Sequence, residues 1–561
     1  MSITVSEYII NTLNQLGVKQ FFGIPGDAIN HLTEAIRVNN KCQFIAVRHE
    51  EVGAFAASAQ AKLSHQPSVC MGTAGPGAIH LLNGLYDANR DGAPVIAITG
   101  QVSTDLIGNS SHQEVDLVRL FDDVASYNQL LTNPKQVQHV LYEAWRTALT
   151  ERSVVHINLP ENVASMKINA PKIENEIIPS DYNITPTETM IEKAAVLLAE
   201  AEKPVILLGD GARTAIENVI QFADKMNAPI IKTLKAKDLI SDSFPLCIGG
   251  VGSLGSAPGT EAMEECDLII LIGTDFPYSE WYPSDKKVIQ IDLSPSHISR
   301  RVPVDVPLVG NANETLILLN RFLVRRKMHC KTKQFLEHCQ KKMRIDRESK
   351  TKQESSTNEP IEPSTLTAKI STIADSEAII CTDTGAVTAW VARHFDMKGN
   401  QRLLLSSNLA SMGFSLPATI GAKLLYPNRQ VLGIAGDGGF SMLMTDLLTA
   451  VKYKLNVTII IFNNQKLGLI QMEQEAKGHP ETETHLQDID YAEYAKICGA
   501  YGVNVTQYEQ LDSALNEAIQ YPGVSVVNVY INREVLVIPP KVQIRQGINY
   551  AKAKVAELIG G

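Results

Sequence analysis

The sequence predicts an α/β protein built from three doubly wound domains, each with a parallel sheet between helices. Short β-branched runs such as PVIAITG, LIILIGT and VTIIIF alternate with amphipathic helical stretches along almost the whole chain. The length of 561 residues is enough for about three or four domains of roughly 100 to 200 residues each. We therefore expect crossover helices that join parallel strands throughout the chain.

Composition divides the chain into blocks. The first block covers residues 1–180 and ends in a segment rich in Pro, Asn and acidic residues. The second block covers residues 190–345, and a polar linker at residues 346–363, almost free of apolar side chains, follows it. The third block covers residues 364–535, and residues 536–561 form a tail. The apolar face of this tail is narrow, so we expect at most weak peripheral contact with a membrane.

Charge and composition exclude several classes of protein. The chain has 51 Lys and Arg against 61 Asp and Glu, so nucleic acid is not an expected partner. The basic stretch 325–352 offers only Phe335 for stacking on bases, and we interpret it as a solvated face. No apolar run approaches the roughly 20 residues that cross a bilayer. The scattered cysteines and the lack of a signal peptide favour the cytoplasm.

The most specific motif lies in the third block, where GDGG ends the predicted strand QVLGIA. Asn463 and Asn464 close the next strand, VTIIIF, so that Asn464 follows Asp437 by 27 residues. Because ligands bind at the carboxyl ends of parallel strands, Asp437 and Asn464 can offer oxygens to one Mg²⁺, and a diphosphate can complete its shell. A helix expected from Ser441 would direct N–H groups toward that anion. The alternative is an ordinary glycine-rich turn.

Together with the following turn KLGLI, these motifs resemble those of the thiamine diphosphate enzymes. The resemblance implies thiamine diphosphate and Mg²⁺ as cofactors, with Asp437, Asn464 and the backbone carbonyl of Lys466 as metal ligands. Met412 matches the bulky apolar residue that holds this cofactor bent, although an isolated Met is otherwise core filler. The cofactor-binding residues implied in this block are Gly385, Met412, Gly438, Gly439, Gly468 and Leu469.

The first block looks like the pyrimidine-binding domain of the same family. The segments FFGIPGDAIN, FIAVRHEEVGAFAA and GTAGPGAIHLLNGLYDA occur in the expected order. Glu50 matches the catalytic glutamate, whose role is to protonate ring nitrogen N1′ of the cofactor. Packing and a place in the site are equally good interpretations of His80 and Asn83. The residues that the resemblance places near the cofactor are Pro25, Gly26, Thr73 and Gly75. Because both halves of such a site come from different subunits, the resemblance implies a homodimer or a homotetramer.

The middle block contains GVGSLG, which has the form GxGxxG. We do not interpret it as an NAD site, because no clear strand precedes it and no helix opens directly on its third glycine. The segments GGVGSLGSAPG, LIILIGTDFPYSEWYP and VIQIDLSP instead resemble the FAD-binding domain of pyruvate oxidases and quinone-linked pyruvate dehydrogenases. A relative that has lost its flavin is the alternative. The residues implied along FAD are Gly252, Ser253, Leu254, Gly255, Thr274, Asp275, Phe276, Pro277, Tyr278 and Asp292.

The resemblance implies a flavoprotein oxidoreductase that decarboxylates pyruvate or a similar small 2-oxo acid. Two electrons would pass to FAD and then to a quinone or O₂, and the product would be acetate or acetyl phosphate. Near the reacting carbon, Leu469, Ile470, Glu473 and Gln113 fit the family pattern. His112 stands where pyruvate-specific relatives commonly have an aromatic residue, so either the 2-oxo acid differs or the exchange is neutral. An acetolactate synthase and a catalytically silent scaffold are the alternatives.

Overall fold

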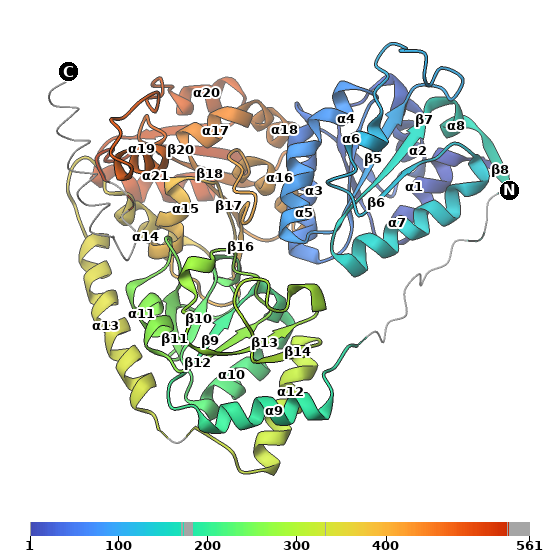
Figure 1. Cartoon of the computed structure of the whole chain (residues 1–561). Helices are drawn as coiled ribbons and strands as arrows, with labels where there is room; N and C mark the ends of the chain where they lie inside the picture. Colours follow the sequence, from blue (N-terminus) through green and yellow to red (C-terminus); the bar gives the residue numbers. More distant parts are fainter. Residues whose placement is uncertain (1, 170–171, 173–182, 331, 536, 538–561) are drawn as a thin grey trace.

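The computed structural model describes residues 2–169, 172, 183–330, 332–535 and 537. They form three domains, each built around a six-stranded sheet in which every strand pair is parallel (Figure 1). The predicted α/β architecture of three parallel-sheet domains is confirmed. Except for Val537, the tail predicted at residues 536–561 lies outside the described residues, as does most of the segment that ends the first block.

The N-terminal domain has the strand order β3-β2-β4-β5-β7-β6, and a small antiparallel pair, β1 with β8, lies beside it. Its strands are β1 (Ser2–Thr4), β2 (Gln20–Gly23), β3 (Gln43–Ala46), β4 (Ser68–Gly72), β5 (Val95–Gln101), β6 (Tyr127–Leu130), β7 (Val154–Pro160) and β8 (Lys167–Asn169). Its helices are α1 (Val5–Gln15), α2 (Asn30–Asn39), α3 (Glu50–Ser64), α4 (Pro76–His80), α5 (Leu82–Asp91), α6 (Leu117–Leu120), α7 (Val137–Glu151) and α8 (Glu161–Ser165).

The middle domain has the strand order β11-β10-β9-β12-β13-β14. Its strands are β9 (Pro204–Leu208), β10 (Ile230–Lys232), β11 (Cys247–Gly250), β12 (Leu268–Ile272), β13 (Lys287–Asp292) and β14 (Val306–Val309). Its helices are α9 (Glu188–Glu200), α10 (Ile216–Met226), α11 (Ala257–Glu265) and α12 (Ala312–Arg325), and α13 (Gln334–Glu354) leads to the last domain. Ile206 and Leu208 of β9 enter one hydrophobic core, whereas Val205 and Leu207 enter another, so both faces of the sheet are buried.

The C-terminal domain has the strand order β16-β15-β17-β18-β20-β19. Its strands are β15 (Ile379–Thr382), β16 (Arg402–Leu404), β17 (Val431–Gly436), β18 (Val457–Asn463), β19 (Tyr501–Val505) and β20 (Val524–Tyr530). Its helices are α14 (Pro363–Ile373), α15 (Ala386–His394), α16 (Ser415–Leu425), α17 (Asp437–Leu443), α18 (Leu447–Lys452), α19 (Gly468–Ala476), α20 (Tyr491–Ile497) and α21 (Leu511–Gln520).

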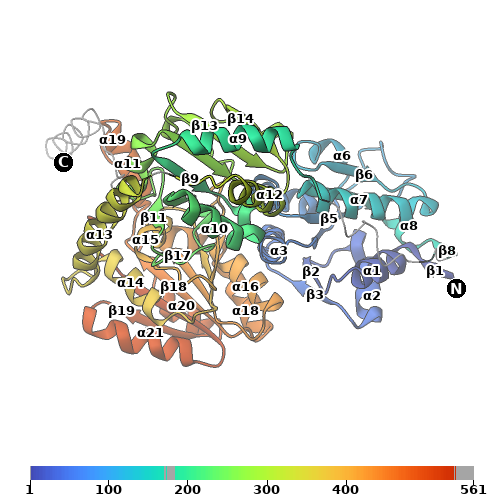
Figure 2. The same cartoon turned by 90° about the horizontal axis from the view of Figure 1, so that it is seen from below.

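Helices α3 and α16 join the first and last domains, and Figures 1 and 2 both show them side by side. A Cβ atom on Gly421 of α16 would lie 2.4 Å from the carbonyl oxygen of Ala56 on α3, so glycine is required at this helix crossing. Phe55 meets Phe414 edge to face, with 5.6 Å between ring centroids. The start of α3, where Glu50 lies, is therefore fixed to a rigid frame.

Half of the predicted linker at residues 346–363 is helical. Helix α13 continues to Glu354, whose carboxylate lies 2.9 Å from Nδ1 of His394 on α15. Its last turns have no apolar face, but Glu, Lys and Arg are good helix formers and Asp346 pairs with Lys350 one turn later. A lack of apolar residues therefore did not mean a lack of structure.

Among the helices that the structure describes, none combines the length and the apolar character that crossing a membrane requires.

Candidate active site

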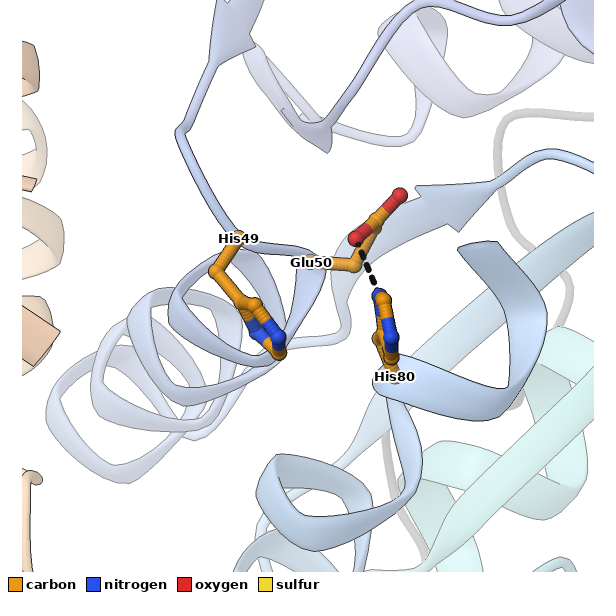
Figure 3. A group of neighbouring side chains, drawn as sticks. All are labelled: His49, Glu50 and His80. Atoms are coloured by element: carbon orange, nitrogen blue, oxygen red, sulfur yellow. Dashed lines mark hydrogen bonds and ion pairs between the residues drawn. The ribbon is translucent and has the colours of Figure 1, made fainter. Parts of the chain in front are cut away.

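Glu50 is the first residue of α3, directly after the turn that follows β3. The side chain of His49 caps the helix by accepting the N–H of Glu51 at 3.3 Å, which fixes the direction in which Glu50 leaves the backbone. Glu50 is buried, with 6% of its surface exposed. Its Oε2 lies 2.9 Å from Nδ1 of His80, at the end of α4 (Figure 3). One carboxylate oxygen is therefore engaged by an imidazole.

The other oxygen of Glu50 faces the turn after β4. A Cβ atom on Gly77 would lie 3.1 Å from Glu50 Oε1 and 2.9 Å from Cγ2 of Thr73. A Cβ atom on Gly26 would lie 2.5 Å from the Cβ atom of Thr73, so the turn after β2 contacts the turn after β4. These close approaches leave room for backbone only. The structure therefore brings the predicted residues Gly26 and Thr73, with Pro25 beside them in the chain, close to Glu50.

The loop before α6 also reaches this cluster. Gly75 has a φ of +64°, and a Cβ atom there would lie 2.8 Å from the carbonyl oxygen of Gln113. Gln113 is half-buried, and its own φ is +61°. Its neighbour His112 is exposed, and the described residues give its side chain no hydrogen bond. The structure thus places Gln113 beside the Glu50 cluster and leaves His112 on the surface of the single chain.

His80 and Asn83, which the sequence left undecided, have different partners. His80 contacts Glu50, and its ring stacks on that of His49 with 4.4 Å between centroids (Figure 3). The amide of Asn83 donates to Glu51 at 2.6 Å and to Oγ of Ser411 at 3.0 Å. Glu50 and Glu51 therefore have separate surroundings, and only Glu50 is buried beside the predicted cofactor turns.

Asp437 lies at the carboxyl end of β17 and is the first residue of α17. The helix therefore begins four positions before Ser441, where the sequence predicted its start, and Gly438 and Gly439 are helical. Oδ2 of Asp437 accepts the N–H of Gln465 at 2.7 Å, which links it to the turn after β18. Asn464 lies in this turn. The carboxylate of Asp437 thus contacts the turn that contains Asn464, at the carboxyl edge of two adjacent parallel strands.

Asp437 has the surroundings of a cation ligand. Burial raises its pKa to about 6, and the contacts that oppose this shift are backbone N–H groups rather than a basic side chain. A buried carboxylate without a basic partner fits a bound metal ion. Mg²⁺ prefers oxygen ligands, which Asp437, the amide of Asn464 and the carbonyl of Lys466 can supply.

Glycine and apolar side chains lie beside the Asp437 turn. A Cβ atom on Gly438 would lie 3.4 Å from Cε of Met412 and 2.9 Å from Cδ2 of Leu467. A Cβ atom on Gly468 would lie 3.0 Å from Nδ2 of Asn464. Met412, Gly438 and Gly468 therefore converge on the Asp437 turn. The open backbone of glycine at this edge fits an anionic diphosphate.

The remaining predicted residues of this domain border the same edge. Gly385 has a φ of +131° at the start of α15, and a Cβ atom there would meet nothing within 4 Å. Leu469, Ile470 and Glu473 lie on α19, and 43% of the surface of Ile470 is exposed. Ile470 and Glu473 share a helix face because they are three residues apart. Both therefore lie on a surface of the single chain rather than in a closed pocket.

The predicted flavin residues gather at the carboxyl edge of the middle sheet. Strand β11 does precede GVGSLG, contrary to the sequence interpretation, and α11 starts at Ala257 after the cap Ser256. Gly252 has a φ of +94°, and a Cβ atom there would lie 3.0 Å from Cζ of Phe276. The predicted segments Gly252–Gly255 and Thr274–Tyr278 are therefore in contact.

This loop also faces the C-terminal domain. Arg393 of α15 donates to the carbonyl of Ser253 at 2.7 Å, and Leu254 packs on the C-terminal core. Asp292 at the end of β13 is buried and lies 3.3 Å from Nδ1 of His297. The residues predicted to line a flavin thus reach from Asp292 at the end of β13 to the side of the middle domain that contacts the C-terminal domain.

The sequence reasoning missed two groups at this edge. Arg300 and Arg301 both pair with Asp275, at 3.0 Å and 2.7 Å. Gly209 and Gly211, after β9, pack directly on Gly273, so that backbone alone separates two strand ends. Gly209 and Gly211, in LLGDGA, directly follow an apolar run, and this pattern could have indicated a strand end at the site. Nothing in the local sequence connects Asp275 with arginines about 25 positions later.

The residues around Glu50 and those around Asp437 form two separate groups within the described part of one chain. No hydrogen bond found there joins Glu50 or Thr73 to Asp437, Asn464 or Met412. Other hydrogen bonds do join the two domains close to these residues: the N–H of Arg48 donates to Asp446 Oδ1 at 2.9 Å, and Asn83 donates to Ser411.

Comparison with known proteins agrees with this arrangement in all three domains. The N-terminal TPP binding domain of thiamine pyrophosphate enzymes matches residues 3–120, their central domain matches residues 191–319, and their C-terminal TPP binding domain matches residues 383–529. The matched ranges contain Glu50, Gly252 and Asp437 respectively.

Similar proteins span nearly the whole chain. YdaP of Bacillus subtilis, named only as a thiamine pyrophosphate-containing protein, is 40% identical over 550 residues, which cover 98% of this chain and 95% of YdaP. A pyruvate oxidase of Lactiplantibacillus plantarum is 31% identical, with 92% of this chain and 86% of the relative covered. A protein of Methanocaldococcus jannaschii named as a probable acetolactate synthase large subunit is 34% identical, with 92% and 89% covered. The chain belongs to the thiamine pyrophosphate enzyme family.

Proposed function

We propose that the protein uses thiamine diphosphate, Mg²⁺ and FAD to decarboxylate pyruvate, or a similar small 2-oxo acid, oxidatively. The observation that carries the proposal is the buried carboxylate of Glu50, with Oε2 engaged by His80 and Oε1 facing the cofactor turns. The Asp437 turn, which fits a metal ion and a diphosphate, supports it. Similarity to a pyruvate oxidase and the contact between Gly252 and Phe276 support the flavin-dependent part.

The bound cofactor would supply a carbanion that adds to the keto carbon and an electron sink for the release of CO₂. Glu50 would hold the proton that is shared with ring nitrogen N1′, and His80 would orient Glu50 for this transfer. Mg²⁺ would be held by the side chains of Asp437 and Asn464 and by the backbone carbonyl of Lys466. Met412 would contact the cofactor. Of these groups, Asp437 already accepts a backbone N–H, that of Gln465.

Other residues would bind the substrate and separate it from water. Gln113 can donate an amide hydrogen bond to the substrate carboxylate, and Ile470 with Leu469 would form an apolar wall around the reacting carbon. Glu473, on the same helix face as Ile470, would supply an acid near that carbon. His112 is the residue that would distinguish among 2-oxo acids. The final electron acceptor would be a quinone or O₂.

We also propose that the active enzyme is a homodimer or homotetramer with a shared site. Three helices that border the two halves expose apolar side chains: Ile79 at 43%, Met442 at 58% and Leu448 at 38%. Such exposed side chains favour a covered surface in the assembly. The eight cysteines are all free, which supports a reducing cytoplasmic location.

A matched pair of variants tests the role of Glu50. Glu50→Gln keeps the size of the side chain but removes its proton-transfer function, so we expect turnover to fall by at least about a hundredfold. The control Glu51→Gln changes the neighbouring acid, which contacts Asn83 instead, and should keep turnover within about twofold. Release of CO₂ from pyruvate with thiamine diphosphate and Mg²⁺ is the measurement. Equal losses in both variants would contradict the assignment.

Acetolactate synthesis is the second candidate, and the 34% identity to the Methanocaldococcus protein favours it. That reaction joins two pyruvates without net oxidation. If acetolactate accumulates and neither an added quinone nor O₂ is reduced, the oxidative proposal is wrong. If an acceptor is reduced in proportion to the CO₂ released, acetolactate synthesis is not the main reaction.

A further inference from the structure

Charged side chains from all three domains line an open pocket, whose empty space is about 390 Å³ when the part open to solvent is included. The N-terminal domain contributes Lys62, His65 and Arg152, the middle domain contributes Arg213 and Lys235, and the C-terminal domain contributes Arg402. None of these residues belongs to the candidate active site. The pocket is therefore a separate feature of the domain junction.

Three of these cations already have close carboxylate partners. Lys62 Nζ lies 2.7 Å from Asp91 Oδ2. Arg213 lies 2.8 Å from Asp238, and Arg402 lies 3.1 Å from the same carboxylate. Because these side chains are largely buried, their ion pairs hold the domains together and leave little binding capacity for another group.

Arg152 and Lys235 are less well paired. Arg152 Nη2 lies 3.9 Å from Asp210 Oδ2, and Lys235 Nζ lies 3.9 Å from Asp91 Oδ1, both beyond hydrogen-bond distance. Their closer contacts are the backbone carbonyls of Gly92, 3.3 Å from Arg152 Nε, and of Asp91, to which Lys235 donates. The side chains are 43% and 29% exposed. Arg152 and Lys235 can therefore each pair with a further negatively charged group.

His65 adds a buried donor to the same wall. Its Nδ1 faces Arg152 Nη2 at 3.5 Å, and its Nε2 is buried without a hydrogen-bond partner among the described residues. Burial, together with Arg152, lowers the pKa of His65 to about 4, so the ring is neutral at pH 7. Since Nδ1 faces a donor, the proton lies on Nε2, which leaves one buried N–H without an acceptor.

Five cationic side chains and two carboxylates, those of Asp91 and Asp210, line the pocket, so its lining carries a net positive charge. Burial alone would raise the pKa of Asp210, yet Lys235, Arg213 and Arg152 together lower it to about 2. Three positive side chains thus act on one carboxylate. An oxyanion here would gain charge-assisted hydrogen bonds from a planar guanidinium and an ammonium group.

We propose that this pocket binds a small oxyanion of the phosphate or carboxylate class, held between Arg152 of the N-terminal domain and Lys235 of the middle domain. The anion adds a bridge between two domains that meet here through 3.9 Å charge pairs and through the hydrogen bond from Lys235 to the carbonyl of Asp91. Because it binds the assembled junction and not the unfolded chain, it raises the stability of the protein by linkage. This site is independent of the proposed reaction.

The test is a titration of the full-length protein with inorganic phosphate at constant ionic strength. Saturating thiamine diphosphate and Mg²⁺ are present throughout, so that the diphosphate site is already filled. We expect the unfolding temperature to rise and saturate as phosphate replaces chloride, and calorimetry to give a single weak site. Acetate in a parallel titration shows whether a carboxylate also binds. The proposal is overturned if neither oxyanion gives a saturable rise beyond that in chloride.

Variants locate the site. Arg152→Gln and Lys235→Gln should each weaken binding by about tenfold, in line with the loss of one charge-assisted hydrogen bond. Arg152→Lys keeps the charge and should retain most of the affinity, which covers the case in which a neutral variant folds poorly. Arg146→Gln is the matched control, because Arg146 lies on α7 but pairs with Glu143 at the surface. Unchanged affinity in both Gln variants would place the anion elsewhere and overturn the proposal.

Discussion

Glu50 illustrates how a single residue acquires a chemical role from its neighbours. The helix cap at His49 sets its direction, the turn containing Thr73 and Gly77 limits its Oε1, and His80 holds its Oε2. A carboxylate with one oxygen hydrogen-bonded to an imidazole and the other close to a tight turn loses little orientational freedom when a cofactor binds. That restraint is what precise proton transfer requires.

Removal of the imidazole tests this restraint. In His80→Gln we expect turnover to fall by about tenfold or more, while the affinity for thiamine diphosphate stays within about threefold, because Glu50 is still present but less well oriented. Turnover and cofactor binding, the latter by calorimetry, are the two measurements.

The control for this variant is His49→Asn. Asn preserves the cap of α3 and removes only the stacked ring, so turnover should change by no more than about twofold. If His80→Gln loses cofactor affinity in the same proportion as turnover, His80 serves packing rather than the orientation of Glu50.

At the residue scale, the sequence identified the candidate acids Glu50 and Asp437 but not all the side chains that contact the acidic residues of the site. Glu50 and Asp437 were predictable because each lies in a distinctive local motif. His80 was not, because α4 is little more than one turn long and its periodicity does not show which face meets Glu50, 30 positions earlier. Arg300 and Arg301 are likewise paired with Asp275 only by the fold.

At the scale of elements, Asp383 connects three segments around the Asp437 turn. Its Oδ1 accepts N–H groups from Thr384, Gly413 and Phe414 at 2.8 to 3.2 Å. Its Oδ2 has no hydrogen-bond partner among the described residues, and a Cβ atom on Gly439 would lie 2.4 Å from it. Asp383 therefore joins the end of β15 to the segment of Met412 and to α17.

Burial raises the pKa of Asp383 to about 7, which makes a pH-dependent prediction. Between pH 4 and pH 7 the folded protein holds a proton that the unfolded chain has released, so this residue lowers the free energy of unfolding as pH rises. Three pKa units correspond to an upper bound on the order of 4 kcal/mol.

Asp383→Asn keeps Oδ1 and cannot ionise. We expect its free energy of unfolding, measured with denaturant on cofactor-free protein, to exceed that of the unmodified protein at pH 8 and to approach it near pH 4. A difference that does not vary with pH would show that Asp383 is not protonated in the folded state.

The strands of sheets that are covered on both faces were predicted well. The bounds of some helices were predicted less well. Strands such as β9, β12 and β18 are continuous apolar runs, which is typical of a parallel sheet covered on both faces. Helix α17 starts earlier than predicted because Gly438 and Gly439 adopt helical geometry, although glycine suggested a loop. Helix α13 extends through half of the predicted linker although its second half buries almost nothing.

At the scale of the whole molecule, the groups proposed to be catalytic come from two domains, and within the described part of one chain no hydrogen bond joins Glu50 to Asp437. If a partner subunit completes each site, Glu50→Gln and Asp437→Asn protein should complement each other after they are dissociated and mixed. A mixed dimer has one doubly altered site and one intact site, so random mixing predicts about a quarter of full activity. Each variant dissociated and reassembled alone is the control. No recovery in the mixture would mean that one chain supplies both halves.

The measurement that tests the central claim most directly is the flavin spectrum under anaerobic conditions. The purified protein should be yellow, and pyruvate added in the presence of thiamine diphosphate and Mg²⁺ should bleach the visible flavin band, because two electrons from the decarboxylated substrate reach FAD. The Glu50→Gln variant should stay yellow under the same conditions. If the unmodified protein releases CO₂ and its flavin band does not bleach, or if the protein binds no flavin, oxidative decarboxylation through FAD is contradicted.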